Sequence, residues 1–254
     1  MVNCIDQIPE ISPLLSIRAI SKHFNERAAI HNLSFSIDPG EIIGVFGDPG
    51  SGKANIIHLL SGMIAPSSGH IWFDGEDITH LSAELRARRG IVCSAQPGSL
   101  FPDLTATENV LIHGVQHHLP LFPRQGGKTY AEEAHDLLDA VGLAECADRL
   151  VGELSAAQQC QVAMAIGLAS KPSLLLVDGT GLSGDKAGAE LGRALTRLTD
   201  RGAAVLFTSA NPSPVVDICD RIVVLHAGVI IARGVPTRFV VEPPVRASYQ
   251  PYLQ

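Results

Sequence analysis

The chain has 254 residues, enough to bury a sizeable core, and its formal net charge of −7 argues against broad nucleic-acid binding. Although 46% of the residues are hydrophobic, no apolar run approaches the roughly 20 residues that a membrane helix needs. The five cysteines are odd in number and scattered, which favours reduced cytoplasmic thiols over a disulfide or metal framework. Residues 1–13 lack a basic region followed by an apolar one, so we expect no secretory signal.

The first part of the chain has the pattern of strands. Residues 14–20 form one expected strand and residues 28–37 another, in which apolar side chains are mostly spaced by two and predict one buried face. Pro39-Gly40 is a turn signal, and a third strand is expected directly after it. Further on, residues 70–73 predict a short strand that ends in a tight turn at Asp74-Gly75.

The third strand leads into a glycine-rich loop, which opens into a segment with helical apolar spacing. The loop reads Gly47-Asp48-Pro49-Gly50-Ser51-Gly52-Lys53. Glycines let the backbone approach a phosphate, while the loop amides, the positive helix end and Lys53 attract its charge. The spacing matches a phosphate-binding loop, except that Ala54 stands where a Ser or Thr hydroxyl would ligate Mg²⁺. An ordinary glycine-rich turn is the alternative, but the lysine, the spacing and the flanking elements all favour the phosphate site.

Beyond the loop, apolar strands alternate with amphipathic helices. Strands are expected at 91–95, 173–177 and 203–208, helices from 105 and at 130–141, 156–169 and 186–198, and a hairpin at 221–225 and 229–232. This alternation predicts a mainly parallel sheet with helices on both faces. The prolines after residue 235 leave the tail at most a broken helix.

In their order along the chain, these motifs resemble the ATP-binding subunits of ABC transporters over nearly the whole length. The matching segments are Gly47–Lys53 (Walker A), Gln96 with Leu100–Thr105 (Q-loop), Leu154–Gln159 (signature), Leu174–Asp178 (Walker B), Asp185 (D-loop) and Asp220–Leu225 after the switch loop. Finer details at 73–79, 119–121 and 243–249 resemble the branched-chain amino acid importers.

The resemblance implies an α/β fold of the P-loop NTPase, ABC ATPase type. Its mainly parallel sheet would carry an N-terminal antiparallel β part and an inserted α-helical subdomain. Residues 14–96 and 171–234 would form the nucleotide-binding core with the β subdomain, 97–170 the helical subdomain with the signature, and 235–254 a C-terminal tail. ATP and Mg²⁺ are the implied cofactors. The implied partners are permease subunits and a second nucleotide-binding subunit, with no nucleic acid, at the inner face of the cell membrane.

The resemblance also implies roles for individual residues. Phe24 would stack on adenine, although a buried aromatic before a strand is nearly as good an explanation. Gln96 and Asp178 would serve a weakly held Mg²⁺. The phosphates would lie among Gly47, Asp48, Gly50, Ser51, Gly52, Lys53, Ala54 and Asn55, and the signature Ser155, Ala156, Ala157 and Gln158 would face the nucleotide of the partner subunit.

Several positions depart from the family pattern. Ala54 has no hydroxyl for Mg²⁺, and Asn55 should point to a different side of the helix. Gly179 follows the Walker B aspartate where the family places a glutamate that polarises the attacking water, and Ala210 occupies the place of the switch histidine. Two glycines of the signature are replaced by Ala156 and Ala157, whose Cβ atoms would crowd the opposite nucleotide. Gln161 and Ile166 replace arginines usual on that helix.

Three functions follow as hypotheses. The leading one is an ABC-type subunit that binds ATP but hydrolyses it poorly or not at all, so that no catalytic residue is assigned. The second is an active ATPase that energises import of branched-chain amino acids or a similar solute. The third is an interaction module that binds no nucleotide.

Overall fold

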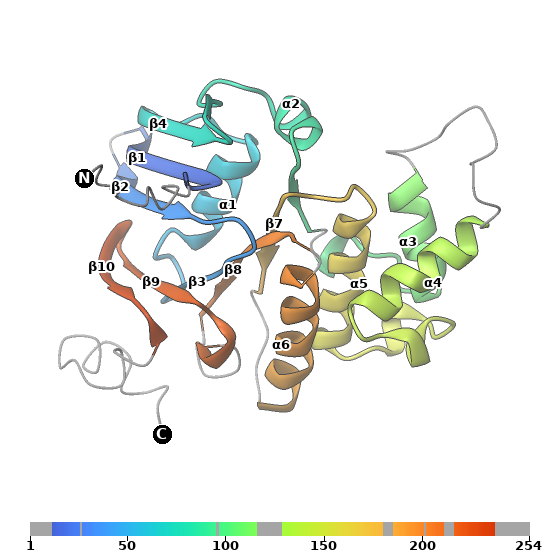
Figure 1. The fold of residues 1–254 in the computed structure, drawn as a ribbon. Helices are drawn as coiled ribbons and strands as arrows, with labels where there is room; N and C mark the ends of the chain where they lie inside the picture. The colour runs from blue at the N-terminus through green and yellow to red at the C-terminus, as the bar shows by residue number, and fades with distance from the viewer. Residues whose placement is uncertain are drawn as a thin grey trace, which may run out of the picture.

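The computed structural model describes residues 12–25, 27–94, 97–115, 129–179, 185–200, 202–210 and 216–236. Two sheets and six α-helices make up this part of the chain (Figure 1). None of these helices is long and apolar enough to cross a bilayer. Gln96 and most of the tail after residue 235 lie outside the described residues.

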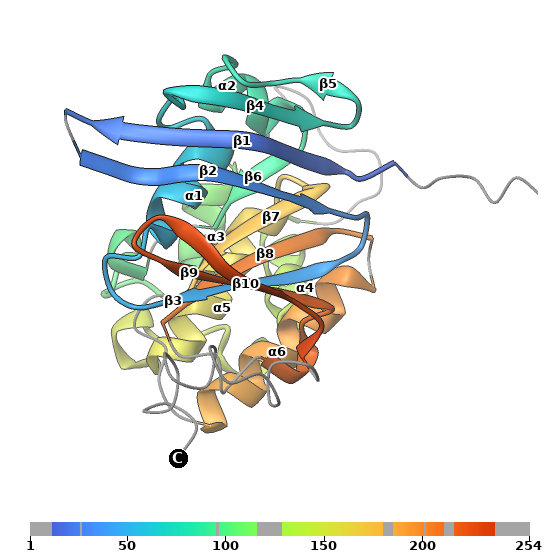
Figure 2. The same cartoon turned by 90° about the vertical axis from the view of Figure 1, so that its left-hand side faces the viewer.

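The first sheet is antiparallel and has the strand order β2-β1-β4-β5 (Figure 2). Its strands are β1 (Leu15–Phe24), β2 (Arg27–Ile37), β4 (Ser68–Phe73) and β5 (Glu76–Asp77). Asp74 and Gly75, with φ of 47° and 77°, form the expected tight turn between β4 and β5. β1 continues to Phe24, four residues beyond the predicted end, because residues 22–24 still pair with β2.

The second sheet is parallel except for one edge strand, and its order is β10-β9-β3-β8-β7-β6. Its strands are β3 (Ile42–Gly47), β6 (Ile91–Cys93), β7 (Leu174–Asp178), β8 (Ala204–Ser209), β9 (Arg221–His226) and β10 (Val229–Gly234). The apolar runs predicted as buried parallel strands are therefore central strands of this sheet, covered on both faces.

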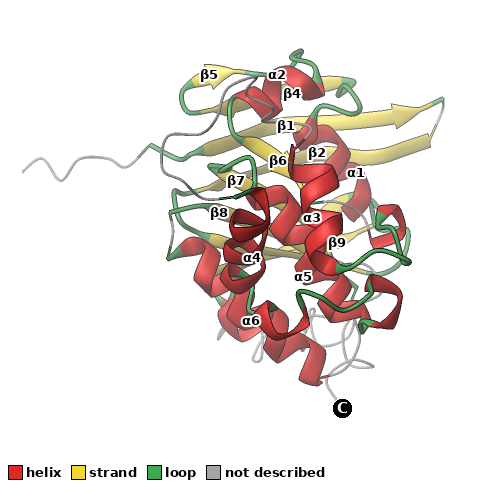
Figure 3. Ribbon diagram, turned by 90° about the vertical axis from the view of Figure 1, so that its right-hand side faces the viewer, coloured by secondary structure: helices red, strands yellow, loops and turns green. Residues whose placement is uncertain are grey.

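Helices cover both faces of the parallel sheet, and the group on one face stands in front of the strands in Figure 3. They are α1 (Lys53–Ser61), α2 (Ala83–Arg88), α3 (Ala106–Val115), α4 (Tyr130–Ala140), α5 (Ala156–Leu168) and α6 (Asp185–Thr199). The alternation along β3 separates two cores: Ile43 and Val45 pack with α1 and the antiparallel sheet, whereas Ile42 and Phe46 pack with α3–α6. α1 ends at Ser61 because Gly62 adopts a left-handed cap with φ 81°.

Candidate functional site

The phosphate-binding loop is shaped by close packing around its glycines. A Cβ on Gly52 would lie 2.8 Å from Ile30 Cδ1, and one on Gly47 would lie 3.0 Å from Ser51 Cβ and closer still to the Leu225 carbonyl oxygen. Gly50 and Gly52 both have positive φ, 81° and 108°. No side chain caps the start of α1, so its first backbone N–H groups suit an anion.

Lys53 lies folded into this loop and is only 8% exposed. Its Nζ donates hydrogen bonds to the carbonyl oxygens of Gly47 and Asp48, the latter at 2.9 Å, and to Ser51 Oγ at 3.4 Å. Burial lowers the pKa of Lys53, and the negative charges of Asp48 and Asp178 oppose that shift. Neutral carbonyls are weaker acceptors for an ammonium than phosphate oxygens. The loop therefore fits a polyphosphate such as that of ATP.

Backbone hydrogen bonds connect the loop to both sheets. The Gly228 amide, in the turn between β9 and β10, donates to the Ser51 carbonyl at 2.9 Å, and the His31 amide of β2 donates to the Gly228 carbonyl at 2.9 Å. His226 Nδ1 lies 3.6 Å from Asp48 Oδ2. The sequence predicted the hairpin of β9 and β10. It did not predict the contact of this turn with the phosphate-binding loop, because no local signal indicated it.

Asp178 stands at the end of β7, on the same edge of the sheet as the loop. Thr208 of the neighbouring β8 is paired with it in register and donates its hydroxyl to Asp178 Oδ1 at 3.3 Å. Among the described residues no group of three His, Cys, Asp or Glu side chains could hold a metal. Ala54, on α1, is exposed and offers no ligand. Asp178 fits Mg²⁺ only together with oxygens of a bound phosphate and water.

Gly179, directly after Asp178, has no space for a side chain. Its amide donates to the Thr208 carbonyl at 2.8 Å. A Cβ there would lie 2.6 Å from that carbonyl oxygen and closer still to two ring carbons of Phe207. Phe207 is 1% exposed and belongs to the core between the sheet and α3–α6. Sequence reasoning missed Phe207, since it reads as one more apolar residue of a buried strand. Ala210, just after β8, is half-buried.

Two other predicted nucleotide contacts, Phe24 and Asn55, lie within the described residues. Phe24 is 47% exposed, so the alternative of a buried aromatic is wrong. The ammonium of Lys22 lies 5.1 Å from the Phe24 ring centroid, an arrangement typical of a cation–π contact. Asn55 is half-buried beside the exposed Ala54. Gln96 falls outside the described residues, so its predicted role is not placed.

The signature region forms the start of α5. Ser155 caps the helix: its Oγ accepts from the Gln158 amide at 3.3 Å, and Gln158 Oε1 accepts from the Ser155 amide at 3.0 Å. Ala156 is exposed, but Ala157 is buried in the protein core. The expectation that both methyl groups crowd an opposite nucleotide is therefore wrong for Ala157, because helical geometry turns its Cβ inward.

Comparisons with known proteins agree with this geometry. A family model described as ABC transporter matches residues 30–180. The lipopolysaccharide export system ATP-binding protein LptB of Acidithiobacillus ferridurans is 31% identical over 240 residues, which cover 94% of this chain and 97% of that protein. The sulfate/thiosulfate import ATP-binding protein CysA 2 of Shewanella oneidensis is 34% identical over 226 residues, 87% of this chain and 62% of that protein. A crystal structure of the ADP conformation of an ATP-binding cassette of an ABC transporter has a TM-score of 0.81 at 24% identity, covering 94% of this chain and 99% of that one, and this likeness concerns the fold.

Proposed function

This chain belongs to the ATP-binding subunit family of ABC transporters, and from that premise we propose that it binds ATP but hydrolyses it poorly or not at all. The P-loop NTPase fold of the ABC ATPase type, expected from the sequence, is confirmed. The observation that carries the proposal is the packing at Gly179, where the ring of Phe207 fills the space that the family's water-polarising glutamate would need.

The proposed loss of hydrolysis rests on three positions that lack the chemical groups used for hydrolysis in the family. Gly179 and Ala210 offer neither a carboxylate nor an imidazole, and Ala54 offers no hydroxyl for Mg²⁺. A positioned general base typically contributes roughly 10²–10⁴-fold in rate. Electrostatic and metal stabilisation of phosphoryl transfer adds comparable factors, although such effects are not additive. Binding should suffer less, because the loop backbone and Lys53 remain.

The proposed partners follow from the family. ABC subunits place each nucleotide between the Walker motifs of one chain and the signature of the other. In a homodimer both sites would lack the same groups. With an active partner subunit, one site would still lack the groups at 179 and 210, and the other would use the altered signature at Ala156. We therefore propose a structural or regulatory subunit that docks on a permease at the cytoplasmic face of a membrane.

The two other hypotheses receive less support. The relatives reported above are named for lipopolysaccharide export and for sulfate or thiosulfate import. Those names give no support to the finer expectation of branched-chain amino acid import. Burying the ammonium of Lys53 is unfavourable. A module that binds no nucleotide would offer no function that compensates for this cost.

Thermal unfolding and phosphate release, measured on the same purified protein, test the proposal. We expect ATP with Mg²⁺ to raise the unfolding temperature, because a ligand of the native state stabilises by about 2.7 kcal/mol at 100 times its Kd. We expect no phosphate release above the blank, and no stabilisation of Lys53→Met by ATP. Release at an ordinary ATPase rate would favour the active enzyme, whereas absence of stabilisation by ATP, with or without Mg²⁺, would favour the interaction module.

A further inference from the structure

Lys22 lies beside Phe24, the aromatic residue expected to stack on adenine. The Lys22 ammonium is placed over the Phe24 ring, 5.1 Å from its centroid, and so covers one face of the ring. The Phe24 side chain is nevertheless 47% exposed. One face of the ring is therefore held by a cation, while the ring as a whole remains accessible to a flat partner.

The end of β1 is held by the segment that follows α1. Lys22 Nζ donates to the Ala65 carbonyl oxygen at 2.8 Å. On either side of this lysine, the His23 amide donates to Ser67 Oγ at 3.0 Å, and the Ser21 carbonyl accepts from the Ser67 amide at 2.8 Å. β1 also shifts its register against β2 on both sides of Lys22, and such irregularities re-aim side chains. The ammonium is thus anchored in the fold.

The pair of Lys22 and Phe24 lies close to the phosphate-binding loop. Lys22 is in register with Ile30 of β2, and a Cβ on Gly52 would lie 2.8 Å from Ile30 Cδ1. Phe24 follows two residues further along β1, which is roughly 7 Å at the usual rise of a strand. A single nucleotide can therefore reach both the loop and the ring.

We propose that Lys22 is a positioning residue for the nucleobase of ATP and acts through Phe24. Its ammonium, anchored by Ala65, fixes the ring through the covered face, so that the open face is oriented to stack on the base. A ring that is already fixed loses less freedom on binding than a mobile one. The proposal rests on the proposed binding of ATP, to which it adds a residue that sets the affinity for the base and not for the phosphates.

Titration calorimetry on the purified full-length protein tests this role, with Mg-ATP and inorganic tripolyphosphate as the two probes. Tripolyphosphate has the phosphates of ATP but no base. Lys22→Met keeps an apolar stem and removes the charge, and we expect it to bind ATP about three- to tenfold more weakly, equivalent to about 0.6–1.4 kcal/mol. Its affinity for tripolyphosphate should not change. Lys22→Arg should bind ATP as tightly as the unsubstituted protein, because a guanidinium also packs on the face of an aromatic ring.

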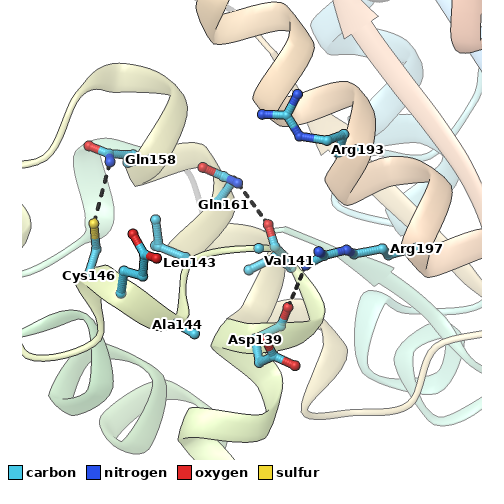
Figure 4. Close-up of a pocket in the computed structure, with 11 residues that line it drawn as sticks. Asp139, Val141, Leu143, Ala144, Cys146, Gln158, Gln161, Arg193 and Arg197 are labelled. Carbon is cyan, nitrogen blue, oxygen red and sulfur yellow. Dashed lines mark hydrogen bonds between the residues drawn. The ribbon is translucent and has the colours of Figure 1, made fainter.

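A double-mutant cycle shows whether the lysine acts through the ring. Phe24→Ala should weaken ATP binding at least about fivefold, and adding Lys22→Met to it should have no further effect, because effects that share one contact are not additive. Arg193→Met is the control for the loss of one positive charge. Arg193 is exposed on α6 and lines a cavity of about 350 Å³ among the helices on the other face of the parallel sheet (Figure 4), so this variant should bind both probes normally.

Three results would overturn the proposal. If Lys22→Met lost affinity for ATP and tripolyphosphate equally, the lysine would act on the phosphates or on the fold. The proposal would also fail if Lys22→Met bound ATP as tightly as the unsubstituted protein, or if it weakened ATP binding equally with and without the Phe24 ring. Absence of ATP binding by the unsubstituted protein would overturn the proposed function as well, so the two failures can be distinguished.

Discussion

Phe207 should decide whether a carboxylate can be accommodated at position 179. In a background that carries Ala54→Ser and Ala210→His, Gly179→Glu adds a Cβ that lies 2.6 Å from the Thr208 carbonyl oxygen and nearer to the Phe207 ring. Overpacking of a close-packed core costs typically 1–3 kcal/mol, and each kcal/mol shifts the unfolding temperature of a domain of this size by about 2–4 °C. We therefore expect the unfolding temperature to fall by roughly 2–12 °C.

Adding Phe207→Val should relieve that strain and allow the glutamate to act. We expect the unfolding temperature to recover in part and phosphate release from Mg-ATP to rise about 10²–10⁴-fold over the starting protein. Phe207→Val alone is the control, which should lose stability through lost packing and gain no activity. If Gly179→Glu is equally stable and equally active with and without Phe207→Val in this background, the ring does not exclude the carboxylate and the steric argument fails.

Two further predictions concern stability and pH. Arg86 is 1% exposed and donates to the carbonyl oxygens of residues 59, 60, 79 and 81. Arg86→Met should therefore lower the free energy of unfolding, measured by chemical denaturation, by about 3 kcal/mol or more. Arg88→Met is the control and should change it by less than about 0.5 kcal/mol. The hydroxyl and amide of Thr79 hold the pKa of Asp77 at about 2, so Thr79→Val should move that pKa up toward 3.8, measured by NMR titration. Because the folded pKa lies below the unfolded one, the contribution of Asp77 to stability is present above pH 3.8 and is lost as the pH falls through 2.

The phosphate-binding loop could be predicted from the sequence because all its determinants are local. The glycine spacing, the lysine and the start of α1 lie within one short segment, and they fold as the pattern indicates. The central strands could be predicted equally well, since continuous apolar runs are typical of strands buried on both faces. Their order in the sheet could not be predicted, because β3 pairs with β8 and β9, which lie far from it along the chain.

The contact between Gly179 and Phe207 shows why the rest of the site needed the structure. Gly179 directly follows β7 and Phe207 lies in β8, so the distance between them depends on the register that pairs Asp178 with Thr208. A sequence shows that a side chain is missing at 179, but not that a neighbour has filled the space. The same holds for Ala157, whose burial depends on which side of α5 faces the core.

Lys53 is stronger evidence for ATP binding than the loop glycines are. Gly47 and Gly52 are required by packing against Ser51, Leu225 and Ile30, so their presence would be expected even in a chain that never met a nucleotide. The ammonium of Lys53, in contrast, is buried against neutral carbonyls, and burial lowers its pKa. A residue that folding alone selected at this position would not need a charge. Lys53→Met should therefore leave the nucleotide-free protein at least as stable as before while removing its response to ATP, and a large loss of stability without nucleotide would mean that the lysine serves the fold instead.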